Sequence, residues 1–206
     1  MENKNLIIIL VLIFLIGGGL IFYYQSGFQL FKPELPEPED VIEEEKPDVV
    51  LEDVVLEKER FSILVPGGWK ELQSPEGVLA MVIKDGEEIT DPEVKAIQFR
   101  SYLAISLGDM TGKTKEEYLD YTRDVIIGIL GEESFFVKEE ELQIKGREAN
   151  IMEIDTTQQG AELKVWVILV FGDEQDVWGM SFNTTQTKWS EYQSAFSKMA
   201  QSFELK

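Results

Sequence analysis

Two short segments carry residue types that could bind a ligand, and the first of them is rich in glycine. Residues Gly108 to Thr114 read GDMTGKT and lie between an expected strand and an expected helix, as a phosphate-binding P-loop does. The spacing G-x-x-x-G-K-T is one residue too short, because a P-loop needs four residues between its glycines to wrap the phosphates. We therefore expect a tight turn followed by a capped helix.

The second segment is acidic. Asp173, Glu174 and Asp176 could offer oxygen ligands to a hard cation such as Ca²⁺. The spacing of an EF-hand loop and its closing glutamate are missing, so we expect a solvated hairpin turn with, at most, weak divalent cation binding. The run from Glu139 to Glu141 cannot face one way on a strand, and it predicts an exposed sheet edge.

Two missing residue types exclude most enzyme mechanisms. The chain of 206 residues has no His and no Cys, so it lacks the commonest general base and any thiol nucleophile. Ser194 and Ser197 on the expected last helix belong to no Ser-x-x-Lys or Gly-x-Ser-x-Gly motif. We predict a protein that is not an enzyme, with no catalytic, cofactor-binding or metal-binding residue. A hydrolase that uses only carboxylates stays open, and it would need two acids within about 10 Å in a cleft.

Two further patterns have more than one interpretation. The tryptophans could line an apolar pocket for a small molecule or a lipid, although such side chains are more often part of the core. Asn183, Thr184 and Thr185 match the N-glycosylation sequon, which is relevant only in a host that glycosylates such sequons. The four tryptophans are Trp69, Trp166, Trp178 and Trp189.

The N-terminal part of the chain predicts a membrane anchor. After a polar tail, residues 1–5, the segment Leu6 to Tyr24 has 19 residues and no charge. As a helix it would be about 28 Å long, close to the thickness of the bilayer hydrocarbon. We expect an uncleaved signal-anchor at 6–24, with the N-terminus in the cytoplasm and the remaining chain outside the membrane.

A linker and a folded domain are expected after the anchor. Residues 25–59 are rich in proline and acid, with 12 Asp and Glu residues between 33 and 59 against two Lys, which favours an extended spacer. Within it, two short apolar clusters, Val49 to Leu51 and Val54 to Leu56, could dock on the domain as an edge strand or a short helix. The domain is expected at 60–206.

Hydropathy patterns in 60–206 predict an α+β fold in which helices cover both faces of an antiparallel sheet. Alternation at Ile97, Phe99, Leu103, Ile105 and Leu107 predicts a half-buried strand, whereas 162–171 is apolar on both faces and should lie centrally. Thr114 and Glu117 fit a capping box that begins the first helix. The expected helices are 115–130 and 188–203, and the expected strands are 61–65, 79–83, 97–107, 135–144, 148–156, 162–171 and 177–183.

Two signatures in this order of elements resemble the PsbP-like domain, the family of the extrinsic photosystem II subunit and its bacterial relatives. They are FSILVPGGWKE at 61–71 and WGMSFNTTQTKWSEYQSAFSKMAQSFELK at 178–206. The resemblance implies an α/β/α sandwich, a fold shared with a Ran-binding nuclear import factor, and a binding or assembly role rather than catalysis.

Charge and anchor together define the expected function. A net charge of −20 repels nucleic acid and anionic lipid surfaces and attracts basic partners. We expect a single-pass membrane protein that presents a PsbP-like domain outside the cell membrane, where it binds a protein partner or helps to assemble an envelope complex. The alternative is a carrier of a small molecule or lipid in a pocket between sheet and helices.

Overall fold

The computed structural model describes residues 51–131 and 134–206. The expected anchor at 6–24 and most of the expected linker lie outside these residues. None of the helices in the described part of the chain is long and apolar enough to cross a bilayer.

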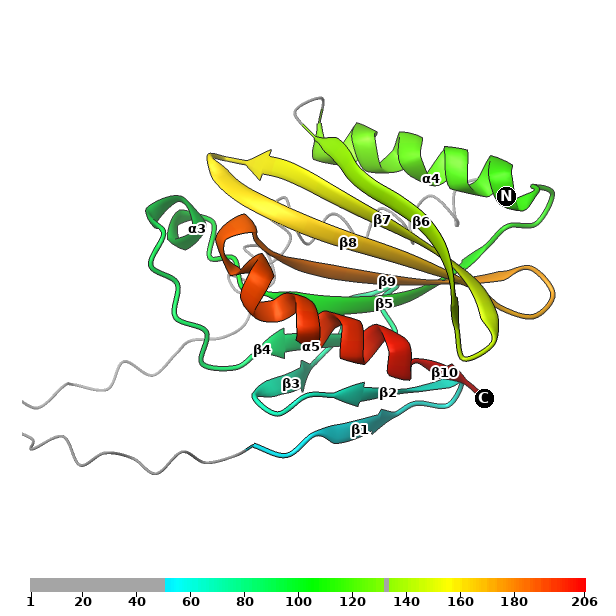
Figure 1. Cartoon of the computed structure of the whole chain (residues 1–206), viewed down its shortest axis with the longest axis horizontal. Coiled ribbons are helices and arrows are strands. Elements are labelled where there is room, and N and C mark those ends of the chain that lie inside the picture. Colours follow the sequence, from blue (N-terminus) through cyan, green and yellow to red (C-terminus); the bar gives the residue numbers. More distant parts are fainter. Residues whose placement is uncertain (1–50, 132–133) are drawn as a thin grey trace, which may run out of the picture.

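A seven-stranded antiparallel sheet forms the centre of the domain (Figure 1). Its strand order is β3-β4-β5-β9-β8-β7-β6, so β6 is an edge strand and β8 lies inside the sheet. The expected strands at 61–65 and 135–144 are confirmed at their predicted bounds. The strands of this sheet are β3 (Trp69–Leu72), β4 (Ala80–Lys84), β5 (Tyr102–Asp109), β6 (Phe135–Ile144), β7 (Arg147–Gln158), β8 (Ala161–Phe171) and β9 (Asp176–Thr185).

One helix covers each face of this sheet, as the sequence predicts. Helix α4 (Lys115–Leu130) shares one apolar cluster with the side chains of β8 that include Val165 and Val167. Helix α5 (Trp189–Ser202) shares the other cluster with Trp166 and Ile168, which alternate with them on the same strand. Both faces of β8 are therefore buried, and the expected α+β class with an antiparallel sheet is confirmed.

A second, three-stranded sheet packs beside α5, and the sequence did not predict it (Figure 1). In it, β2 (Phe61–Val65) lies between β1 (Val54–Glu57) and β10 (Glu204–Leu205). Val54 pairs with Val65, so of the two states left open for 54–56 the structure shows the edge strand. The short strands β3 and β10 were also missed, because two to four residues carry too little alternation to be recognised.

The expected strand at 97–107 is wrong in its first half. Residues 97–101 form a turn and an irregular segment that follow a short helix α3 (Pro92–Ala96). Asp91 caps this helix by accepting hydrogen bonds from the backbone N–H groups of Glu93 and Val94, and proline follows it. The chain then turns through Gln98, whose φ is 52°, and β5 begins only at Tyr102. Tyr102 is itself fully buried, so β5 is covered on both faces rather than half-buried.

The helix ends follow the sequence closely. Thr114 and Glu117 form both hydrogen bonds of the capping box, which satisfies two backbone donors that would otherwise lack a partner. Gly131 ends α4 with a φ of 89°, a conformation that glycine adopts without strain. A single 3₁₀ turn, η1 (Gln186–Lys188), leads into α5.

A nearly buried charge cluster lies on the α5 face, between β7 and β8. Lys164 Nζ is 2.7 Å from a carboxylate oxygen of Glu153 and 2.7 Å from one of Asp155, and it lies 5.3 Å from the ring centre of Trp189. Burial lowers the pKa of Lys164, but the hydrogen bonds that its ammonium group donates to Asp155 and Glu153 outweigh this effect, and the net shift of the pKa is upward. A lysine nucleophile needs a lowered pKa, so this cluster is structural.

We expect Lys164→Ala to lower the free energy of unfolding by about 3 kcal/mol, because it leaves two neighbouring carboxylates without their cation. Urea denaturation monitored by tryptophan fluorescence measures this loss. Lys95→Ala, which removes an exposed lysine, is the matched control and should change stability by less than about 0.5 kcal/mol. Equal effects of the two substitutions would contradict a stabilising role for the cluster.

Candidate functional site

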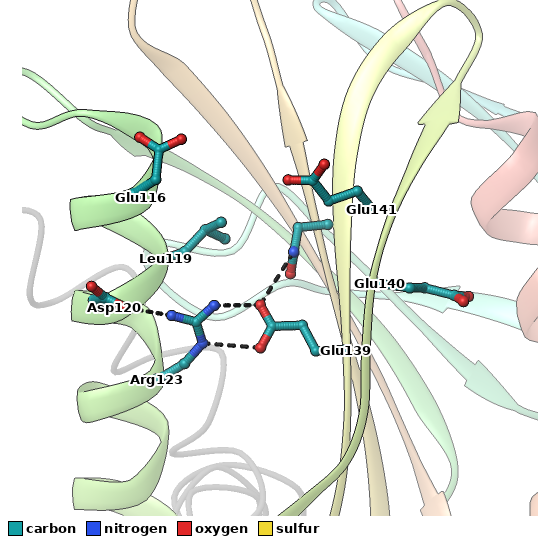
Figure 2. A pocket seen from close by; sticks show the side chains of 8 residues that line it. Glu116, Leu119, Asp120, Arg123, Glu139, Glu140 and Glu141 are labelled. Carbon is teal, nitrogen blue, oxygen red and sulfur yellow. Dashed lines mark hydrogen bonds and ion pairs between the residues drawn. The ribbon is translucent and has the colours of Figure 1, made fainter.

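A charged groove of about 390 Å³ lies between α4 and the edge strand β6 (Figure 2). The helix contributes residues three or four positions apart, which share one flank of α4. Strand β6 contributes three successive glutamates, and Asn150 of β7 completes the lining. The lining residues are Glu116, Leu119, Asp120, Arg123, Glu139, Glu140, Glu141 and Asn150.

The pairing of β6 with β7 decides which glutamates face the helix. Glu139 lies opposite Met152 and Glu141 lies opposite Asn150, and Met152 belongs to the apolar cluster that α4 covers. Glu139 and Glu141 therefore point towards α4, whereas Glu140 points away (Figure 2). The predicted exposed edge is confirmed for β6, although the side chain of Glu139 is less exposed, at 29%, than that of Glu141, at 73%.

Arg123 joins the helix to the edge strand. Its Nε lies 3.0 Å from one carboxylate oxygen of Glu139 and its Nη2 lies 2.5 Å from the other, a forked arrangement that fixes both side chains. A second carboxylate, that of Asp120, accepts a hydrogen bond from Nη1. The guanidinium holds the pKa of Glu139 below its usual value, and the Asn150 amide adds to this shift.

Asn150 forms the floor of the groove. Its side chain is 2% exposed, and Nδ2 donates to Glu139 Oε1 at 3.3 Å. Because a carboxylate only accepts hydrogen bonds, this contact fixes the orientation of the amide. Asn150 Oδ1 is then left without a hydrogen-bond donor, which is costly for a buried polar atom.

The glycine-rich segment Gly108 to Thr114 forms the turn and capped helix that were expected. The N–H of Thr111 donates to Asp109 and that of Glu117 donates to Thr114, so these donors are not available to a phosphate. Strand β5 is antiparallel to both its neighbours, unlike the strand of a P-loop. Gly108 has a packing role, since an added Cβ would lie 2.5 Å from the Tyr118 hydroxyl.

The acidic turn at 173–176 is held by arginines. Arg147 forms two hydrogen bonds with Asp173, of 3.0 and 2.8 Å, and Arg60 pairs with Asp176. Across residues 51–131 and 134–206, no set of three or more Asp or Glu side chains converges closely enough to hold a metal ion. The turn therefore gives no support to a calcium site.

The tryptophans belong to the apolar core on the α5 face. Trp69 packs edge-on against Phe196, Trp166 packs against Trp189, and Trp178 packs against Phe61. These contacts fill the space that a ligand pocket would need. Asn183 of the sequon is 1% exposed and donates to Ser181, so the folded domain does not offer it for modification.

Hydroxyl and carboxyl groups also meet outside the groove, at Ser101. Ser101 Oγ donates to Glu87 at 2.7 Å and lies 2.8 Å from the Thr184 hydroxyl, but its side chain is fully buried. Ser194 is exposed and Ser197 is half-buried on α5. A buried serine cannot reach a substrate, so the Ser101 contacts stabilise the fold.

The three glutamates of β6 were predicted only as an exposed sheet edge, and neither Arg123 nor Asn150 was predicted to line a site. One signal for Asn150 was present, because it interrupts the apolar residues of 149–152 in the buried middle of β7. Arg123 gave no such signal, since an arginine on a helix is normally solvated. Its role depends on β6, which is distant in the sequence.

We expect Glu139→Gln to be less stable than the native chain by about 1 kcal/mol at pH 7, because it removes the charge of the fork. The lowered pKa of Glu139 means that this contribution is present above the ordinary pKa of about 4.5 and is lost as the pH falls through the lower, folded-state value. The difference should therefore shrink below pH 4.5 in urea titrations. Glu76→Gln in an exposed loop is the control, and a difference independent of pH would contradict the ionic role.

Comparison with known proteins identifies the fold. No protein-family model and no curated protein matches the chain. The cyanobacterial PsbP protein of Synechocystis has a TM-score of 0.51 and 12% identity over 78% of this chain and 96% of its own. The Ran-binding protein Mog1p of Saccharomyces cerevisiae has a TM-score of 0.52 and 13% identity over 75% and 96% of the two chains. LpqN of Mycobacterium tuberculosis, described as involved in cell envelope biogenesis, has a TM-score of 0.53 and 11% identity over 75% and 91%.

The three structures agree in architecture while sharing very little sequence with this chain. At such low identity the likeness shows the fold and does not transfer an activity. The resemblance noted from the sequence is thus confirmed for the fold: the described residues from β1 to β10 adopt the fold seen in the PsbP and Mog1 structures.

Proposed function

We propose that this protein is a non-catalytic binding protein, held in the cell membrane by residues 6–24, which presents its PsbP-like domain outside the membrane to a protein partner. The observation that carries the proposal is the groove between α4 and β6. It combines four carboxylates with a buried acceptor that has no donor, which is the chemistry of a recognition site more than of a packed surface.

The membrane part of the proposal rests on the sequence. The uncharged segment 6–24 is long enough to span the hydrocarbon layer, and the acidic segment that follows would hold the domain away from an anionic lipid surface. A domain tethered in this way meets partners in or near the membrane. We infer a role in assembling a membrane or envelope complex.

The groove chemistry favours binding over hydrolysis. Acid catalysis by a carboxyl group requires a raised pKa, whereas the pKa of Glu139 is lowered by Arg123. Arg123 also occupies both oxygens of that carboxylate. Glu139 and Asp120 are bridged by one guanidinium, that of Arg123.

The alternative function, a carrier of a small molecule or lipid, finds no support at the tryptophans, because they pack on one another and on neighbouring rings. The α4–β6 groove is lined mainly by carboxylates. Such a surface binds an acyl chain poorly, because the acids would lose their hydration.

Photocrosslinking in membranes tests the proposal. A benzophenone amino acid replaces Val137, which is 48% exposed on β6. As a control, the same amino acid replaces Leu79, which is 42% exposed and lies near the opposite edge of the sheet. We expect the full chain to sediment with membranes and to give a discrete adduct from position 137 alone. Recovery of the chain in the supernatant would contradict the anchor, and equal adduct patterns from both positions would contradict the site.

A further inference from the structure

We propose that the α4–β6 groove binds a lysine- or arginine-rich extended segment of the partner protein, and that one of its cationic side chains donates a hydrogen bond to Asn150 Oδ1. This inference rests on the proposed function and specifies the chemistry of the partner. It follows from three features of the groove: the acceptor at its floor, the unbalanced charge of its walls, and the open edge of β6 beside it.

The unpaired acceptor of Asn150 determines which kind of group can bind at the floor of the groove. Asn150 Oδ1 has no donor, and the contact of Nδ2 with Glu139 prevents the amide from turning over. Carboxylates line the groove in which this residue lies, so an incoming group that also carried an acceptor would be repelled. An ammonium or guanidinium group carries only donors and fits this position.

The walls carry more negative charge than the domain neutralises. Four carboxylates and one guanidinium face the groove, since Glu140 points away and pairs with Lys138. Arg123 is already shared by Glu139 and Asp120. Lys115 reaches Glu141 only at 3.2 Å and is divided between it and Glu148 at 3.3 Å. Because Glu141 is 73% exposed, this pair is weak and can be exchanged for a pair with a partner.

The groove is too large for a single water molecule and unsuited to a metal ion. Its volume of about 390 Å³ is far above the roughly 30 Å³ that one water takes in the liquid. Within the described residues no three acids converge on a common point as a metal would need. A long cationic side chain matches both the space and the charge.

The edge strand favours a peptide over a free amine. In the described chain β6 pairs with β7 alone, so its outer backbone groups can pair with an added strand. Phe135 is 59% exposed and Val137 is 48% exposed on the same strand, and they offer apolar contacts that a small amine would leave unused. An extended basic peptide can use both the unpaired backbone groups of β6 and these apolar side chains.

Calorimetry with acetylated hexa-arginine amide as the probe tests this inference on the full-length chain in dodecyl maltoside at 50 mM NaCl. We expect saturable binding that weakens at 300 mM NaCl, and no binding of hexa-glutamine. Glu116→Gln with Glu141→Gln should weaken binding by about fivefold, the effect of two exposed ion pairs. Asn150→Leu, which keeps the shape but removes the acceptor, should weaken it by about threefold or more.

The matched control is Glu76→Gln with Glu204→Gln, which removes the same charge from exposed positions on other elements. It should change the affinity by less than twofold. Equal weakening by both double variants would show attraction by net charge alone and overturn the inference. An absence of hexa-arginine binding would also overturn it, while an adduct at position 137 in the crosslinking experiment would leave the proposed function standing.

Discussion

The structure depends on covering a sheet that is apolar on both sides. Strand β8 buries Val165 and Val167 on one face and Trp166 and Ile168 on the other. Neither face can remain in water, because each buried side chain contributes roughly 1.5–3 kcal/mol to stability. Two amphipathic helices meet this requirement, and their placement follows from it.

The groove is a consequence of how α4 satisfies this constraint. The helix buries Leu119 and Ile126 against the sheet, and this brings its polar flank over β6. Arg123 then faces Glu139 across the sheet edge, and their forked pair fixes the width of the groove. The polar flank of α4 lies over one face of β6 and leaves its outer edge unpaired. The desolvation cost of placing charged groups there is reduced because most of the carboxylates stay in water.

Features set by neighbours in the sequence could be predicted, and those set by distant pairing could not. Thr114, Glu117 and Gly131 fix the ends of α4 locally, so its bounds were correct. The strand predicted at 97–107 begins only at Tyr102, because the backbone N–H groups of Ile97, Gln98 and Phe99 bond back to carbonyls of the preceding helix α3. The groove depends on the register of β6 against β7 and on the rotation of α4, and neither can be read from spacing alone.

The most direct measurement of the central claim is a nuclear magnetic resonance titration of the isotope-labelled domain with hexa-arginine. We expect the side-chain amide of Asn150 and the backbone amides of α4 and β6 to shift together along one saturable curve. Shifts confined to α5 and the small sheet, or spread evenly over all exposed acids, would contradict recognition in the groove.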